Sequence, residues 1–125
     1  MKLLYTFFGT LTGITEKKVG ESYPETDWRM RYVGCPGLIA VYESEHRAVG
    51  KTFIYFYPDD SSSQMQDWLR TSAGVLQVAD DVYILVTGNS IYKYLRDDDA
   101  LPEERKLLMY LNLGLQPDDL GTQNL

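Results

Sequence analysis

Arginine and tyrosine are the residues in this chain whose chemistry suits a bound ligand. Arg29 and Arg31 are two residues apart, so an extended strand would place both guanidinium groups on one face. Arg105 falls at the border of the apolar stripe of an expected late helix. A guanidinium group holds phosphate through paired hydrogen bonds, and a tyrosine ring stacks on a planar base. The candidate ligand-binding residues are Arg29, Arg31, Asn89, Tyr92 and Arg105.

Each candidate also has a structural interpretation. The arginines would form ion pairs with the acidic residues that are frequent in this chain. Asn89 lies at the centre of an expected hairpin turn, where asparagine tolerates a positive φ. Tyr92 and Tyr94 alternate with Arg96, which favours a partly wet face for all three. Composition alone leaves both interpretations open.

The sequence supplies little for catalysis. His46 and Cys35 are the only histidine and the only cysteine, and a Cys–His pair has no support beyond their presence. The two residues are too few for a zinc site, and the aspartate clusters lack the spacing of a calcium loop. No glycine-rich phosphate loop is present, because residues 34–37 form a Gly-Cys-Pro-Gly turn. We therefore expect no enzyme activity, no metal and no cofactor.

Tyrosine is unusually frequent, with ten residues in 125. In the strand-like run from Lys51 to Tyr57, Phe53, Tyr55 and Tyr57 share one face, and the aliphatic and aromatic residues between them share the other. The second face is expected in the core. The tyrosine face requires hydrogen bonds or water for its hydroxyls, so core and interface remain alternatives there.

Strand patterns dominate the chain. A first hairpin is expected from residues 2–8 and 10–14, a strand at 28–33, a hairpin from 38–42 and 51–57, and another from 82–86 and 91–95, with Gly88-Asn89 as its turn. A helix is expected to begin near residues 61–63 and to end at Gly74, with Met65, Trp68 and Leu69 on its buried face. A second is expected over 101–113, with a stripe of Leu101, Leu108, Leu111 and Leu115 and a stop at Gly114.

These elements predict an α+β fold. It comprises an antiparallel sheet of about five to seven strands with two helices packed on one face. Residues 1–125 are expected to form a single domain, with 117–125 as a frayed tail. A sheet with aromatics on both faces needs cover on both, so a homo-oligomer or a ligand is expected on the face without helices.

The net charge of −6 is unevenly distributed. Residues 1–57 carry seven Lys/Arg and six Asp/Glu, a balance of +1, whereas residues 58–125 carry five and twelve, a balance of −7. This acidity disfavours binding to duplex nucleic acid; it suits either solubility or a basic protein partner. No stretch approaches the roughly 18 apolar residues that cross a bilayer, and the N-terminus makes a poor signal peptide. With a single cysteine, a cytoplasmic location is expected.

The layout resembles that of small phage proteins that disarm bacterial immunity, and most narrowly the Thoeris anti-defence sponge family. The resemblance covers the whole acidic, aromatic, cysteine-poor chain, including an early arginine pair (Arg29, Arg31), a hairpin asparagine (Asn89) and an arginine in the final helix (Arg105). It implies an oligomer that sequesters cyclic ADP-ribose isomers in the host cytoplasm without turning them over. It also implies arginines on the pyrophosphate and an aromatic ring such as Tyr92 on adenine.

Two other functions remain open from the residues. The acidic second half would suit an inhibitor of the anti-CRISPR or immunity-protein type that binds a basic protein partner. Carboxylates would also allow an enzyme that acts on a nucleotide, although no specific pair is indicated. Charge reversal at Asp97, Asp98 and Asp99 would abolish binding to a basic protein partner and spare a nucleotide site.

Overall fold

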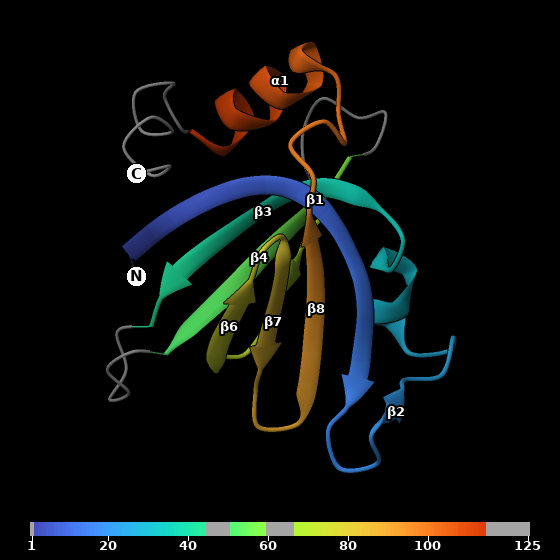
Figure 1. The fold of residues 1–125 in the computed structure, drawn as a ribbon. Coiled ribbons are helices and arrows are strands. Elements are labelled where there is room, and N and C mark those ends of the chain that lie inside the picture. The colour runs from blue at the N-terminus through green and yellow to red at the C-terminus, as the bar shows by residue number, and fades with distance from the viewer. Residues whose placement is uncertain (1, 45–50, 60–66, 115–125) are drawn as a thin grey trace.

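Antiparallel strands make up most of the computed structural model, which describes residues 2–44, 51–59 and 67–114 (Figure 1). The strands are β1 (Lys2–Glu16), β2 (Glu21–Ser22), β3 (Pro36–Glu43), β4 (Thr52–Pro58), β5 (Leu69–Arg70), β6 (Val75–Ala79), β7 (Val82–Val86) and β8 (Ser90–Arg96). A 3-10 helix, η1 (Trp28–Tyr32), and an α-helix, α1 (Glu103–Leu113), complete the fold. The strands form one sheet in the order β5-β4-β3-β1-β8-β7-β6, with β2 beside β1.

The sheet curls round until its two edges meet. Thr52 at the start of β4 and Gly74 just before β6 exchange backbone hydrogen bonds of 2.9 and 2.8 Å. The stretch from β5 to β6 therefore pairs with β4 at one end and with β7 at the other. The paired strands in this ring are antiparallel, and most of them are close neighbours along the chain; the exception is the pairing of the first strand, β1, with the last, β8. Closure at this point shortens the free edges that an open sheet would leave.

β1 is one continuous strand, so the expected hairpin from residues 2–8 and 10–14 is wrong. Its first half pairs with β3 and its second half with β8. Gly9 lies at the crossover and makes no turn. A Cβ at this position would lie 2.1 Å from the carbonyl oxygen of Leu95, so glycine serves the close approach of β8. A register shift between Leu11 and Gly13 bends the strand as it crosses between partners.

The interior of the ring is the main core. It contains buried side chains from β1, β3, β4, β5, β7, β8 and η1: Phe7, Leu11, Ile14, Tyr32, Ile39, Val41, Ile54, Phe56, Leu69, Tyr83, Leu85, Tyr92 and Tyr94. The prediction that Ile54 and Phe56 face the core is confirmed. The prediction of a partly wet face for Tyr92 and Tyr94 is wrong, because the closed sheet turns that face inward.

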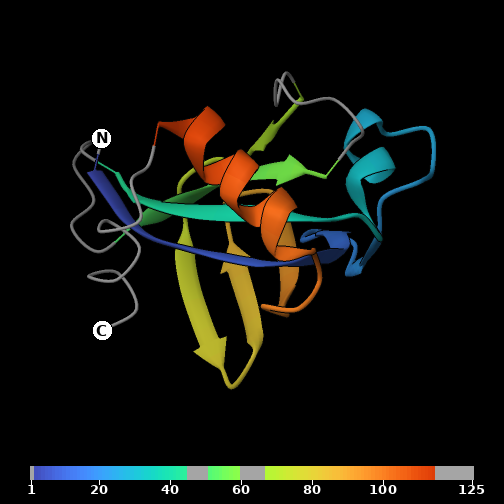
Figure 2. The same ribbon diagram turned by 90° about the horizontal axis from the view of Figure 1, so that it is seen from above.

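A second, smaller core lies outside the ring under α1. Phe8 and Leu38 on the outer face of β1 and β3 pack with Leu101 and Met109, and Figure 2 shows α1 lying across these strands. The helix ends at Gly114, which has a φ of 82°, as expected. Its buried face differs from the expected stripe, because Met109 is buried whereas Leu111 is exposed; Leu115 lies outside the described residues.

The α+β class and the antiparallel sheet are confirmed, but the second helix on the sheet is not found. α1 is the single α-helix of the parts that the structure describes. Of the helix expected between residue 61 and Gly74, residues 61–66 lie outside the described chain, and Leu69–Arg70 form β5. Leu69 is buried as expected, but Trp68 is exposed. The expected tail at 117–125 also lies outside the described residues.

The hairpins β3–β4 and β7–β8 agree with the sequence pattern. The strand expected at 28–33 is instead η1. Its cause is local: the Asp27 side chain accepts a hydrogen bond from the Arg29 amide at 3.0 Å, and the Met30 amide donates to the Asp27 carbonyl. The alternation of apolar residues and arginines in η1 therefore does not indicate the two faces of a strand.

Candidate functional site

Arg29 occupies the centre of a polar network at one opening of the ring. The Asp27 carboxylate that caps η1 also accepts hydrogen bonds from Nε and Nη2 of Arg29, both at 3.0 Å. Such a two-pronged pair fixes the plane of the guanidinium group. The remaining nitrogen, Nη1, points toward β8.

Two residues of β8 hold the other side of this guanidinium group. Nη1 of Arg29 donates to the Tyr92 hydroxyl at 2.9 Å and to Ser90 Oγ at 3.1 Å. The ring of Tyr23, from the segment after β2, lies under the guanidinium carbon at 4.2 Å. Its hydroxyl is 2.7 Å from Ser90 Oγ and donates to the Asn89 carbonyl at 3.1 Å. Two parts of the chain that are distant in sequence, the segment from Tyr23 to Arg29 and the start of β8, thus meet at Arg29.

These residues line a hollow of about 380 Å³, here named the Arg29 hollow. Its lining comprises Tyr23, Arg29, Ser72, Thr87, Gly88, Asn89, Ser90 and Tyr92. The β7–β8 turn that forms one wall is held by the Thr87 hydroxyl, which donates to the Ser90 carbonyl and accepts from the Ser90 amide. Asn89 is exposed and does not have a positive φ, which among described non-glycine residues occurs at Asp80. The turn interpretation of Asn89 through positive φ is therefore wrong.

Four charged residues lie at or beside the hollow. The Lys17 ammonium donates to the Thr87 carbonyl at 3.3 Å, Arg29 is paired with Asp27, and Glu16 lies opposite Ser90 in the β1–β8 register, so two bases balance two acids there. Hydrogen bonding to Asp27 raises the pKa of Arg29 against the opposing effect of burial, and the same bond lowers the pKa of Asp27. Both groups are thus charged at neutral pH, and they form an ion pair.

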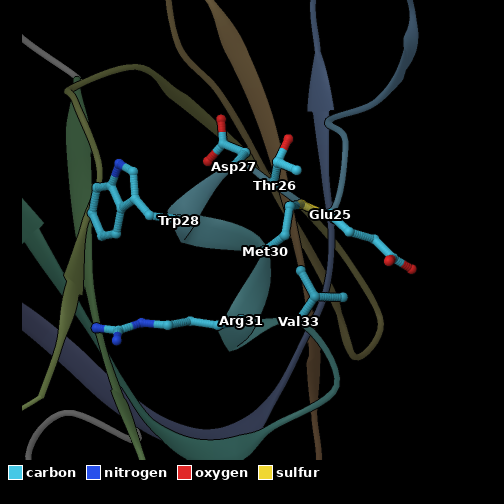
Figure 3. Close-up of a pocket in the computed structure, with 7 residues that line it drawn as sticks. All are labelled: Glu25, Thr26, Asp27, Trp28, Met30, Arg31 and Val33. Atoms are coloured by element: carbon cyan, nitrogen blue, oxygen red, sulfur yellow. The ribbon is translucent and has the colours of Figure 1, made fainter.

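Arg31 lies away from this hollow. Its Nη2 donates to the Tyr32 hydroxyl at 2.7 Å and to Asp67 at 3.0 Å. It lines a different hollow of about 440 Å³, formed by the segment from Glu25 to Val33 (Figure 3). The ion-pair interpretation fits Arg31, and the expected arginine pair on one strand face is not formed.

Arg105 lies on α1, outside the ring. Its Nε and Nη2 donate to Asp59 at 2.9 and 2.6 Å. Among the sequence candidates the structure therefore groups Arg29, Asn89 and Tyr92, and leaves Arg31 and Arg105 apart. Tyr92 is 4% exposed, so it offers its hydroxyl rather than its ring face.

Sequence reasoning missed Tyr23, Asp27, Ser90 and Lys17. Asp27 had a local signal, because an aspartate two residues before an arginine suits a cap that also pairs with it. Ser90 belongs to the hairpin turn that the sequence does predict. Tyr23 and Lys17 reach the site only through the way β1 and β2 fold against the β7–β8 turn, for which the sequence has no local signal.

Among the residues that the structure describes, no group of three or more His, Cys, Asp or Glu side chains could hold a metal ion. His46 lies outside those residues, and Cys35 donates from its Sγ to the Arg31 carbonyl at 3.6 Å. No helix of the described chain is long and apolar enough to span a membrane. Comparison with protein-family models, with curated proteins and with solved structures gives no match.

Proposed function

We propose that the protein binds and sequesters a small, phosphate-bearing cyclic nucleotide of the cyclic ADP-ribose type in the Arg29 hollow, without turning it over. The proposal is supported chiefly by one observation: a polar hollow lined by a half-buried arginine, hydroxyl groups and an amide exists in a chain whose net charge is −6. Its volume of about 380 Å³ is within the roughly 300–1,000 Å³ of small-molecule sites. Such sequestration would antagonise a bacterial anti-phage signal.

The hollow offers the groups that a nucleotide phosphate and ribose require. Arg29 and Lys17 supply positive charge. Ser72, Ser90 and the exposed amide of Asn89 line the hollow with hydroxyl and amide groups that bind ribose hydroxyls or phosphate oxygens. Tyr23 is only partly buried, so its ring, rather than that of Tyr92, is the one available beside the base.

An anion in the Arg29 hollow would compete with the Asp27 carboxylate for the Arg29 guanidinium group. Four hydrogen bonds to described residues engage the Arg29 guanidinium, two of them to the Asp27 carboxylate, and the group has five N–H donors in all. A phosphate therefore competes with Asp27 for the same fork. Removing the charge of Asp27 should strengthen phosphate binding, because the competing carboxylate is gone while Arg29 keeps its bonds to β8.

The experiment is a calorimetric and thermal-shift titration with cyclic ADP-ribose isomers, followed by chromatographic recovery of the ligand. A ligand at a hundred times its dissociation constant stabilises the fold by about 2.7 kcal/mol. Asn89→Ala keeps the backbone carbonyl that accepts from Tyr23, so it should fold normally and bind about tenfold more weakly. Asp27→Asn should bind more tightly.

Arg105→Gln is the matched control. It removes a guanidinium that pairs with Asp59 on the other side of the sheet, so it should leave ligand affinity unchanged. The proposal fails if none of the isomers stabilises the wild type, or if Asp27→Asn and Asn89→Ala bind as wild type does. Conversion of the ligand into a product would replace sequestration with catalysis.

The proposal extends to a cytoplasmic location, the host's if a phage encodes the chain, and to a homo-oligomer. The outer face of β3 and β4 supports the latter. There Tyr42 stacks on Phe53 with ring centroids 5.3 Å apart, Tyr55 stacks on Tyr57 at 6.0 Å, and Arg70 lies 4.8 Å over Phe53. Sedimentation of the wild type should show more than one copy per particle. A strict monomer at every concentration would remove the oligomer from the proposal and leave the Arg29 hollow untouched.

A further inference from the structure

One stretch of sheet edge remains unpaired among the described residues once the ring has closed. Gly74 pairs with Thr52 at the start of β4, and this is the last contact between the two edges. From Val75 to Ala79, β6 pairs with β7 alone among the described strands. Figure 2 shows the β6–β7 hairpin extending away from the layer of β3 and β4. The outer edge of β6 is therefore open to a further strand.

The backbone groups at this edge follow from the alternation of hydrogen bonds along a strand. Gly74 directs both its amide and its carbonyl to Thr52, at 2.8 and 2.9 Å, and thus away from β7. In an antiparallel ladder, successive residues direct these groups to alternate sides. Leu76 and Val78 therefore direct theirs to the same side as Gly74, where no backbone partner lies in the described chain.

The side chains of β6 do not protect this edge. Natural edge strands discourage pairing through charged side chains, prolines or bulges. Residues 75–79 have the sequence Val-Leu-Gln-Val-Ala, which contains no charge and no proline, and they pair with β7 without a register shift. Val75 and Val78 are each 51% exposed. An open, uncharged edge of this kind favours the addition of a strand.

We propose that a second copy of the chain covers this edge, with the two β6 strands antiparallel across a two-fold axis at Gln77. In this register Leu76 of each copy lies opposite Val78 of the other, so every unpaired amide and carbonyl meets its complement. An axis at Leu76 would instead oppose Val78 to Gly74, whose groups are already bonded to Thr52. The position of the closing contact thus selects one register.

The same register keeps the acidic ends of the two strands apart. Asp80 and Asp81 follow β6 in its turn to β7, and antiparallel pairing places them at opposite ends of the contact. Asp80 lies three residues from the axis, so it would be roughly 20 Å from its counterpart, beyond the Debye length of about 8 Å. A chain with a net charge of −6 thus meets itself here without like charges in contact. β6 has no charged side chain that would select a foreign strand, whereas a second copy supplies the matching register.

Gln77 is the position that reports on this contact. Its exposed side chain would lie beside the same side chain of the second copy, with Cβ atoms about 5 Å apart, and each amide both donates and accepts. The inference rests on the homo-oligomer of the proposed function and names its contact. No residue from 75 to 79 lines the Arg29 hollow, so a failure of this contact is distinguishable from a failure of ligand binding.

The test is sedimentation of Gln77→Lys and Gln77→Glu, separately and mixed. Each variant alone places like charges opposite each other at the axis, so its self-association should be at least about tenfold weaker than that of the wild type. An equimolar mixture places lysine opposite glutamate and should restore association to within about threefold of wild type. Leu107→Lys, on the exposed side of α1, changes the net charge as Gln77→Lys does and should associate as wild type does.

Amide hydrogen exchange gives a second readout of the same contact. Exchange at Leu76 and Val78 should slow as the protein concentration rises, because the second copy accepts from these amides, whereas the amide of Gln77 is held by β7 at every concentration. A monomeric wild type would leave the edge to a strand of another protein and overturn the proposal. Association that survives both Gln77 variants would assign the oligomer to another face. The proposal is equally overturned if the mixture stays monomeric, if Leu107→Lys weakens association as much as Gln77→Lys, or if exchange at Leu76 and Val78 is independent of concentration.

Discussion

Two tyrosines on β8 differ by one hydrogen bond, and the same substitution should change stability in opposite directions at the two positions. Tyr92 and Tyr94 both point into the ring core. The Tyr92 hydroxyl accepts from Arg29 at 2.9 Å, whereas the Tyr94 hydroxyl is buried without a hydrogen-bond partner among the described residues. Burial raises the pKa of Tyr94 well above its usual value, as expected for a hydroxyl in apolar surroundings.

The magnitudes follow from what each hydroxyl exchanges for water. A buried, unsatisfied hydroxyl costs about 1–3 kcal/mol, so Tyr94→Phe should stabilise the fold by about 1–2 kcal/mol. Tyr92→Phe removes a hydrogen bond to a charged group that is 18% exposed and should destabilise by about 1 kcal/mol. Tyrosine-to-phenylalanine changes leave the ring in place, so packing changes little in either variant.

Urea unfolding of the two variants and the wild type tests this pair. Equal m-values would show that the shift in midpoint reports native stability rather than a change in the unfolded chain. The midpoint should rise for Tyr94→Phe and fall for Tyr92→Phe. A loss of stability in Tyr94→Phe would show that its hydroxyl gains a partner in solution, and would refute the reasoning.

Two further predictions concern the glycines of β1 and the loss of stability at alkaline pH. Gly9→Ala should destabilise the fold by about 3 kcal/mol or prevent folding, because its Cβ would lie 2.1 Å from the carbonyl oxygen of Leu95. Gly13→Ala on the same strand, whose Cβ would have nothing within 4 Å, should leave stability unchanged or raise it by about 0.5 kcal/mol. Urea unfolding measures both variants, and equal effects would contradict the role of Gly9. Burial, with a smaller contribution from Tyr83, raises the pKa of Tyr5 from 10.0 to about 12. Its neutral form is thus favoured in the folded state. Stability should hold below pH 10 and fall as pH rises toward about 12; Tyr5→Phe should flatten that fall, and an unchanged slope would contradict it.

The elements that the sequence predicts correctly carry their information locally. The β7–β8 hairpin has alternating residues around a Gly88-Asn89 turn, and β3 pairs with β4 as the patterns indicate. α1 has acidic residues in its first turn and ends at Gly114, which adopts a left-handed conformation. In each case turn or cap chemistry and periodicity agree, so no tertiary contact is needed to decide the element.

The errors arise where a distant contact decides. Gly9 looks like a turn residue, but its meaning depends on β8, which approaches it from 86 positions later in the sequence at Leu95. Tyr92 and Tyr94 look half-wet because alternation with Arg96 is typical of an open sheet. Closure through Thr52 and Gly74 reverses that, since the inner face of a closed sheet has no water side. Closure of the sheet has no periodic pattern in the sequence from which it could be predicted.

The candidate site shows the same division between local and distant information. The sequence indicates that Arg29, Asn89 and Tyr92 suit a ligand, and folding brings them to one hollow. It does not indicate that Asp27 already occupies two of the guanidinium nitrogens. That pair gives Arg29 two possible roles. If Arg29 only fastens η1 to β8, Asp27→Asn gains no ligand; if Arg29 holds its charge ready for a phosphate, the same change raises the affinity for an anion. Because the ion pair is partly exposed, its contribution to stability should be small, so the affinity of Asp27→Asn is the measurement that separates a structural clasp from a binding site.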